Sequence, residues 1–307
     1  MKKFELTSEF VVNIFGIKLF RIRALVSFGR VKAGEQGGYV EKEENLSQIG
    51  NAWVSGKAEV YGDAKVYGNT EVSGNAWVSG NAEVYGDAKV FGNTEVSGNA
   101  KVYGNAKVYG NTKISGNVRV FGNTEVSGNA KVYGNAMVYG NAEVSGNAWV
   151  FGNAKVSGNA WVFGNAKVYG DAEVSGNAWV YGNAEVSGNA EVYGDAMVYG
   201  NAEVSSDAWV YGDAEVFGNT KISGNAWISG NAEVSDNADY ATVKGFGRFN
   251  RNTTFFRCKG GKVCVACGCF FGDLEEFRAI VKRTHGDGRM AKEYLAIADL
   301  MEMHFKG

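Results

Sequence analysis

Apolar and polar residues alternate along most of this chain in a pattern that repeats every six residues. Each hexad reads Asn or Asp, a small residue, a variable residue, an aliphatic residue, then Ser, Tyr or Phe, and finally Gly, as in Asn51–Gly56. The aliphatic position recurs 31 times, from Val54 to Val234, with no slip in register. The small and aliphatic residues are two positions apart, so on a strand both side chains point to the same face. The pattern therefore predicts one short strand with an apolar inner face in every hexad.

The last position of each hexad is Gly, except at Ser206 and Asp236. The first position of the next hexad is Asn or Asp, except at Lys57. Gly and Asn enter backbone conformations with positive φ at little cost. Each Gly-Asn step therefore predicts a tight corner between successive strands. Together the hexads predict a solenoid, whose coils bury their apolar faces by stacking between end caps.

The two ends of the chain lack the hexad. Residues 1–44 are expected to form a β-rich N-terminal cap, because polar and apolar residues alternate over Lys18–Arg23 between breaks at Gly16 and Gly29. The solenoid is expected to occupy residues 45–243, and a small C-terminal module residues 244–307.

The C-terminal module is predicted to have a ββαα order. Two strands, 253–257 and 263–271, flank the turn signal Lys259-Gly260-Gly261-Lys262. Asp273 and Glu276 have the spacing of a capping box, which predicts a helix with Leu274, Phe277, Ile280 and Val281 on its apolar face. A second helix is expected over residues 289–305.

The hexads resemble the repeat of left-handed parallel β-helices, and the whole chain resembles the YdcK-type hexapeptide-repeat proteins of bacteria, phages and prophages. This resemblance implies an all-β solenoid of about ten triangular coils, three hexads to a coil, and it alone implies the left hand. It also implies a homotrimer. Besides the coils, the resemblance rests on residues 21–25, 31–34, 37–43 and 45–47, on Cys267-Gly268-Cys269-Phe270, and on Thr284-His285-Gly286-Asp287.

Composition and charge narrow the possible partners. The chain has 44 Gly and no Pro, and its net charge is −2. Residues 51–243 carry 11 basic and 20 acidic side chains, so duplex DNA is a poor partner, whereas residues 244–307 carry 12 basic and 7 acidic ones. Charged residues interrupt the apolar N-terminal stretch, so we expect no membrane span, no signal peptide and a cytoplasmic location with reduced cysteines.

An enzymatic reading has little support in the sequence. Hexapeptide acyltransferases, which the coils resemble, use coenzyme A and a His general base. The two histidines of this chain, His285 and His304, lie outside the coils, and no insertion between hexads provides a loop around an acceptor. We therefore expect no catalytic residues, with a coenzyme A-dependent acyltransferase as the alternative.

Cys264, Cys267 and Cys269, together with His285, are weak candidates for a metal site. Cys258, Cys264, Cys267 and Cys269 fall within twelve residues, but only Cys264 and Cys267 have the C-x2-C spacing typical of zinc. On a continuous strand Cys267 and Cys269 share one face and Cys264 takes the other. We therefore expect buried thiols rather than a metal site or any cofactor, and a helix C-cap at Gly286 beside His285.

Outward aromatic residues are the strongest candidates for binding. Residues three hexads apart are expected to stack, so rings recur in vertical columns that stack on themselves, pack against other subunits or bind a flat ligand. The candidate residues, with His285, are Tyr67, Tyr85, Tyr103, Phe121 and Tyr139 on one edge, Phe163, Tyr181, Tyr199 and Phe217 on another, and the Trp161–Trp179 and Trp209–Trp227 pairs.

The favoured function is a non-catalytic trimeric scaffold. It is expected to bind a host small molecule, such as a nucleotide signal of antiviral defence, or a host protein. The phage-type resemblance suggests that role, and a purely structural spacer is a further alternative.

Overall fold

The computed structural model of the chain describes residues 1–248 and 250–306. The chain divides into two compact units, Met1–Gly164 and Asn165–Gly307. Each carries coils of a parallel β-solenoid, about 11 turns over both, which confirms the predicted fold class. Handedness stays a prediction.

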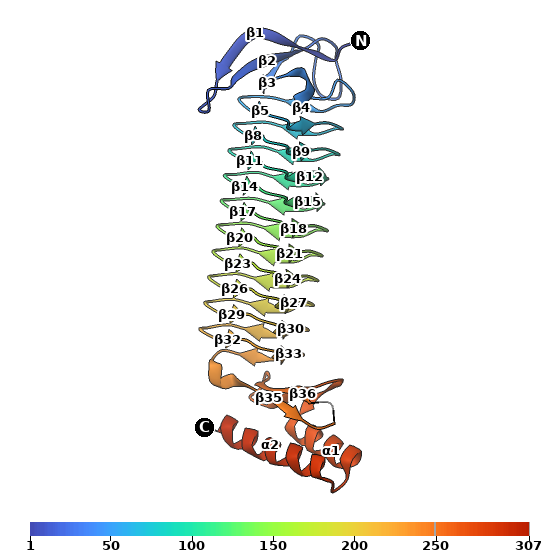
Figure 1. The fold of residues 1–307 in the computed structure, drawn as a ribbon, viewed down its shortest axis with the longest axis vertical. Coiled ribbons are helices and arrows are strands. Elements are labelled where there is room, and N and C mark those ends of the chain that lie inside the picture. The colour runs from blue at the N-terminus through green and yellow to red at the C-terminus, as the bar shows by residue number, and fades with distance from the viewer. Residues whose placement is uncertain (249, 307) are drawn as a thin grey trace. The chain divides into compact units, whose positions relative to one another are not determined.

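In the first unit, most hexads contribute a two-residue strand made of the outward variable residue and the aliphatic residue (Figure 1). Strands that lie three hexads apart in the sequence pair in parallel, as Glu59 does with Trp77. The backbone supports this stacking, because the Ser73 amide donates to the Val90 carbonyl one coil further on, at 2.9 Å.

The coil strands of the first unit have the following bounds. They are β4 (Trp53–Val54), β5 (Glu59–Val60), β6 (Lys65–Val66), β7 (Glu71–Val72), β8 (Trp77–Val78), β9 (Glu83–Val84), β10 (Lys89–Val90), β11 (Glu95–Val96), β12 (Lys101–Gly104), β13 (Lys107–Val108), β14 (Lys113–Ile114), β15 (Arg119–Gly122), β16 (Glu125–Val126), β17 (Lys131–Val132), β18 (Met137–Val138), β19 (Glu143–Val144), β20 (Trp149–Val150), β21 (Lys155–Val156) and β22 (Trp161–Val162).

The core of the coils consists of the small and aliphatic positions, as the pattern predicts. Ala136 and Val138, for example, have no exposed surface. Five Thr residues replace the small Ala and are equally buried. The Thr112 hydroxyl donates to the Tyr109 carbonyl at 2.7 Å, whereas the buried Thr124 hydroxyl has no hydrogen-bond partner.

Glycine is required at the corners for two separate reasons. Gly116 has φ +91°, and a Cβ atom added there would lie 2.6 Å from the Gly134 carbonyl oxygen of the next coil. The corner Asn side chains form ladders beside these glycines, as where the Asn75 amide donates to the Asn93 carbonyl oxygen at 2.9 Å. Backbone conformation and close stacking therefore both select glycine.

The N-terminal residues form an antiparallel β region, as predicted, but part of it belongs to the solenoid. Strands β1 (Phe4–Val12) and β2 (Lys18–Ala24) pair antiparallel. Strand β3 (Gln36–Val40) pairs antiparallel with β2 and in parallel with β5, and the turn η1 (Glu43–Asn45) follows it. Val40 lies opposite Val60. The offset between them is two residues longer than three hexads, so the six-residue period of the sequence does not reveal this coil.

Side chains of the N-terminal region cover the first coil. Trp53, at an outward position, is only 5% exposed because Phe4 and Phe28 pack edge-on against it. The Lys3 ammonium is buried beside them and donates to the Ala52 carbonyl at 2.8 Å. Burial lowers the pKa of Lys3 to about 8.

The second unit continues the same hexad geometry within itself and then changes. Its coil strands are β23 (Lys167–Val168), β24 (Glu173–Val174), β25 (Trp179–Val180), β26 (Glu185–Val186), β27 (Glu191–Val192), β28 (Met197–Val198), β29 (Glu203–Val204), β30 (Trp209–Val210), β31 (Glu215–Val216), β32 (Lys221–Ile222), β33 (Trp227–Ile228) and β34 (Glu233–Val234). Ser206, which replaces a corner glycine, keeps the positive φ of 61°.

The rest of the second unit, which follows the turn η2 (Asn237–Asp239), is a small sheet covered by two helices; we call it the C-terminal module. Its elements are β35 (Tyr240–Phe246), β36 (Arg251–Arg257), β37 (Val263–Cys267), β38 (Phe270–Asp273), α1 (Leu274–His285) and α2 (Arg289–Lys306). The sheet is antiparallel in the order β35-β36-β37-β38. The predicted sheet and helices are confirmed, and so is the capping box, in which Asp273 accepts from the Glu276 amide at 2.9 Å.

The sheet has four strands where the sequence predicted two. Gly268 has φ +62° and ends β37, so the predicted strand 263–271 is two strands joined by a turn. Strand β35 lacks a clear alternation and begins before the expected boundary at residue 244.

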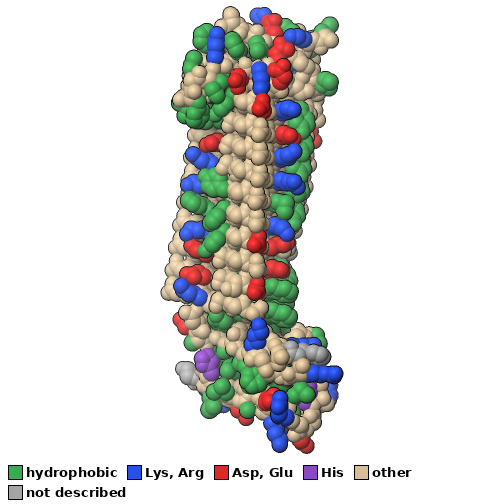
Figure 2. Space-filling view, in the orientation of Figure 1, with side chains coloured by type: hydrophobic (Ala, Val, Ile, Leu, Met, Phe, Trp, Pro, Cys, Tyr) green, Lys and Arg blue, Asp and Glu red, His purple; other side chains and the backbone are tan. Residues whose placement is uncertain are grey.

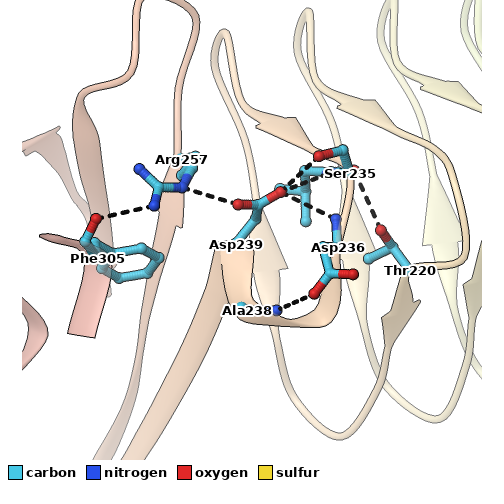
Figure 3. Close-up of polar contacts among 8 residues, drawn as sticks. Thr220, Ser235, Asp236, Ala238, Asp239, Arg257 and Phe305 are labelled. Atoms are coloured by element: carbon cyan, nitrogen blue, oxygen red, sulfur yellow. Dashed lines mark hydrogen bonds and ion pairs between the residues drawn. The ribbon is translucent and has the colours of Figure 1, made fainter. Parts of the chain in front are cut away.

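A polar cluster joins the last coil to the C-terminal module (Figure 3). The Asp239 carboxylate accepts from the Ser235 and Asp236 amides at 3.0 Å, from the Ser235 hydroxyl at 2.8 Å and from the Arg257 guanidinium at 2.8 Å. Arg257 also donates to the Phe305 carbonyl at the end of α2. Burial would raise the pKa of Asp239, but these hydrogen bonds outweigh it and lower the pKa.

Candidate ligand-binding site

Five of the predicted aromatic residues form a continuous stack in the first unit, which we call the Tyr67 column. Neighbouring ring centroids are 4.8 to 5.1 Å apart and the planes are within 6° of parallel. The column therefore stacks on itself, which is one of the three predicted alternatives. Its members are Tyr67, Tyr85, Tyr103, Phe121 and Tyr139.

This spacing leaves no room for a ligand between the rings. A flat molecule between two rings needs a gap of about 7 Å, twice the contact distance between carbon atoms. Only the ends of the column can offer a free ring face. At one end Val138 pairs with Val156, so the position one coil beyond Tyr139 is occupied by Ser157, which has no ring.

A mostly basic row runs beside the Tyr67 column, and we call it the basic stripe. It is formed by the outward residues two positions before the five rings, which are Lys65, Glu83, Lys101, Arg119 and Met137, and by Lys155 in the next coil. Figure 2 shows that charged and apolar side chains lie in vertical columns on the coils.

The one acidic member of the basic stripe is held by its neighbours. Lys101 pairs with Glu83 at 3.2 Å, and the Tyr67 hydroxyl donates to Glu83 at 3.3 Å. Burial, followed by the Glu83 charge, raises the pKa of Tyr67 to about 12. Tyr67 is therefore an uncharged hydrogen-bond donor at neutral pH.

The second unit has shorter columns. The rings of Tyr181, Tyr199 and Phe217 stack at 4.9 and 5.0 Å, and Trp209 stacks on Trp227 at 5.2 Å. Trp161 and Phe163 of the first unit meet edge-on, with centroids 6.4 Å apart. The stacking of Trp161 on Trp179 and of Phe163 on Tyr181 stays a prediction.

The C-terminal module contains a cavity of about 460 Å³, which the sequence did not predict. It brings together three predicted candidates, Cys267 at the end of β37, Cys269 in the turn that follows and His285 at the end of α1. Two arginines that the sequence did not single out, Arg248 and Arg251, line it as well.

The prediction that the cysteines are reduced is wrong for one pair. Cys258 and Cys264 form a disulfide, because the β36–β37 hairpin brings their Cα atoms to 6.0 Å. The placement of Cys267 and Cys269 on one strand face is also wrong, because β37 ends at Cys267 and Cys269 lies in the turn that follows. Both are free thiols.

Comparison with protein families identifies a repeat within the coils. Residues 130–146 match the family model of the YdcK Beta solenoid repeat. This segment therefore carries a YdcK-type β-solenoid repeat. No curated protein matches the chain in sequence.

Both histidines lie outside the coils. His285, at the end of α1, stacks on Tyr294 with centroids 6.0 Å apart, and Gly286 follows it with a positive φ of 55°, as the predicted C-cap requires. His304 lies in α2, edge-on to Phe305. Both belong to the helices of the C-terminal module, and the hexads of residues 51–235 contain no histidine, so nothing here adds support to the acyltransferase alternative.

Three of the weak metal candidates, Cys267, Cys269 and His285, line the same cavity, but they are not grouped closely enough to hold a metal ion. Cys264 is held in the disulfide, and among residues 1–248 and 250–306 no three His, Cys, Asp or Glu side chains are grouped to hold a metal ion.

No helix in the described part of the chain is both long and apolar enough to cross a membrane.

Proposed function

We propose that this chain is a non-catalytic, homotrimeric, cytoplasmic scaffold that binds and sequesters a small anionic molecule, with a nucleotide as the candidate. The observation that carries the proposal is the Tyr67 column beside the basic stripe, a rigid surface that combines aromatic rings with positive charge. A phage or prophage origin of the protein and a role against host defence remain predictions that rest on the resemblance. The alternative that the scaffold binds a host protein instead of a small molecule also remains a prediction.

The end of the column is the place where such a ligand fits. The ring face of Tyr139 that looks toward Ser157 has no ring in register with it, and Lys155 lies in the same coil as Ser157. A base stacking on Tyr139 would place its phosphate near Lys155, with Arg119 two coils away. Stacking of one base on an aromatic side chain is worth about 1 to 3 kcal/mol.

The test compares two Tyr→Ala variants by titration with adenosine monophosphate. Tyr139→Ala is expected to weaken binding by about tenfold, because Tyr139 is the terminal ring of the column and its face toward Ser157 has no ring in register with it. Tyr103→Ala is the matched control, since its ring is stacked on both faces by Tyr85 and Phe121. Equal losses in both variants would contradict this placement, and no binding of adenosine monophosphate by the native chain would contradict the nucleotide.

The homotrimer is tested separately by native mass spectrometry of the full chain from its host cytoplasm. We expect the mass of three chains plus a stoichiometric small molecule. Exposed rings support the trimer, since Trp149 and Trp161 are 39% and 40% exposed and apolar surface of this kind is typically covered in oligomers. A bare monomer would contradict both trimer and ligand.

A further inference from the structure

The cavity of the C-terminal module has a mainly apolar wall. Phe277, Val281 and Tyr294 form its floor and belong to the buried core of the module. Phe270, Ile280 and Met290 line it from β38, α1 and α2 and are only partly buried. Its volume of about 460 Å³ lies within the range of small-molecule sites, roughly 300 to 1,000 Å³.

Positive charge lies around this apolar wall. Arg248, Arg251 and His285 line the cavity, and none of its described lining residues is Asp or Glu. Two adjoining hollows share residues with it and add Lys244 on one side and Arg289 on the other, again without an acidic lining residue among those described. Figure 2 shows basic side chains gathered over the C-terminal module.

The acidic groups of this part of the module lie away from the cavity lining. Glu293 pairs with Arg289 at 3.0 Å, and Asp287 follows His285 in the exposed turn between the helices. Arg248 and Arg251 each line the cavity and one adjoining hollow. Both are exposed residues, within reach of solvent and of an arriving ligand.

The inner polar groups are already hydrogen-bonded within the protein. The Tyr294 hydroxyl donates to the Phe246 carbonyl at 3.3 Å, and the Thr253 hydroxyl donates to the Cys267 sulfur at 3.1 Å. Burial, followed by the neighbouring Cys267, raises the pKa of Tyr294, which therefore stays uncharged. The deep part of the cavity thus offers an apolar surface, and the charges are confined to its rim.

We propose that this cavity binds a small amphipathic anion, a molecule with an apolar chain or ring and one carboxylate or phosphate group. The planar guanidinium of arginine matches both head groups with two parallel hydrogen bonds. The head group would lie between Arg248 and Arg251, and the apolar body would lie against Phe270, Ile280 and Met290. This site is independent of the Tyr67 column, which lies in the other unit.

The first experiment titrates the full chain with four probes by calorimetry: octanoate, octyl phosphate, octanol and inorganic phosphate. Octanoate or octyl phosphate is expected to bind at least about tenfold more tightly than octanol or inorganic phosphate. Only the first two have both an apolar chain to contact the cavity wall and an anionic group to bind the arginines at the rim. The preferred head group identifies a carboxylate or a phosphate as the natural one. Equal affinity for octanol, equal affinity for inorganic phosphate, or no binding of either amphiphile would overturn the proposal.

Variants locate the binding in the cavity. Arg251→Ala is expected to weaken octanoate binding by about tenfold and Arg251→Lys by less, because a charge-assisted hydrogen bond is lost in the first and a charge is kept in the second. Lys282→Ala is the matched control, since Lys282 is an exposed cation of α1 that does not line the cavity. Loss of binding in Lys282→Ala as large as in Arg251→Ala would contradict the site.

A chemical readout does not depend on any variant. Cys269 is exposed and lines both the cavity and one adjoining hollow, so bound octanoate should slow its alkylation by iodoacetamide. Unchanged alkylation at saturating octanoate would overturn the placement. Tyr139→Ala should leave octanoate binding intact, which separates failure of this site from failure of the nucleotide proposal.

Discussion

The coils of the first unit and the C-terminal module differ in how they use their residues. In the coils, the same six positions perform the same tasks in every hexad, so Ala and Val fill the core and Gly makes the corner. In contrast, Arg257 of the module bridges Asp239 of the turn η2 and the Phe305 carbonyl, and this arrangement does not repeat among the described hydrogen bonds. Repetition produces a rigid surface with few distinctive sites, whereas the irregular region concentrates varied chemistry around one cavity.

The largest effect we predict tests whether the coils depend on close stacking or only on backbone conformation. Gly176 and Gly224 have nearly equal φ values of +70° and +68°, but a Cβ at Gly176 would lie 2.8 Å from the Gly194 amide nitrogen, whereas one at Gly224 meets nothing within 4 Å. Gly176→Ala is expected to cost about 3 kcal/mol in the free energy of unfolding and Gly224→Ala about 1 kcal/mol.

Urea denaturation of both variants measures this difference. Both carry the penalty of a positive φ, so the difference between them reports the contact between coils. Equal losses would mean that the coils separate slightly at little cost, as Ser206 at φ 61° suggests for one corner. Such a result would contradict the expectation that Gly224 tolerates a side chain better than Gly176 does.

The second prediction concerns the anchor of the C-terminal module. Asp239→Ala leaves the Ser235, Asp236 and Arg257 donors without their acceptor, and we expect a loss of about 2 to 3 kcal/mol in module stability. Because hydrogen bonds lower the pKa of Asp239, its contribution is complete above the pKa of the unfolded chain, near 4, and is lost as the pH falls through the lower folded value.

Hydrogen exchange of α1 and α2 at pH 7 and pH 3 tests the anchor. Faster exchange in Asp239→Ala at pH 7, with a smaller difference at pH 3, is the expected result. The coils of the same unit serve as an internal control, since the ladder carboxylates of Asp195 and Asp207 each accept one side-chain amide among the described hydrogen bonds, whereas Asp239 accepts from four donor groups. Equal acceleration in coils and helices would show that the module is no more dependent on single residues than the repeats.

The smallest effect distinguishes two residues that look equivalent in the repeat. Thr112→Val removes the hydrogen bond to Tyr109 and should cost about 1 kcal/mol, whereas Thr124→Val removes a buried hydroxyl without a partner and should gain about 1 kcal/mol. Thermal unfolding of the two variants measures the difference. Changes of the same sign would mean that hexads are interchangeable even in their polar details.

The coils were predictable because one local rule decides them. The two-residue alternation placed Ala136 and Val138 in the core, and the glycine positions placed the corners. The extra coil formed by β3 was missed because its longer offset from β5 breaks the six-residue period. Its pairing depends on contacts between residues far apart in sequence, which periodicity does not report.

The candidate sites were predictable only in part. The Tyr67 column follows from rings placed three hexads apart, and its self-stacking was one of the open alternatives. The cavity could not be foreseen, because it depends on a turn at Gly268 that brings Cys269 toward α1 and on arginines next to a loop. A run of cationic residues at Lys244, Arg248 and Arg251 was the one sequence signal that could have marked it.

The pairing of residues three hexads apart also limits how such a chain can change length. Within one unit, inserting or deleting three hexads returns every later residue to its original face, so ring columns, Asn ladders and buried Val residues all remain aligned. A change of one hexad would leave the core intact but move each later outward residue to the next face, and the Tyr67 column would be divided. Duplications of whole coils are therefore the steps by which this architecture can grow while keeping its surface pattern.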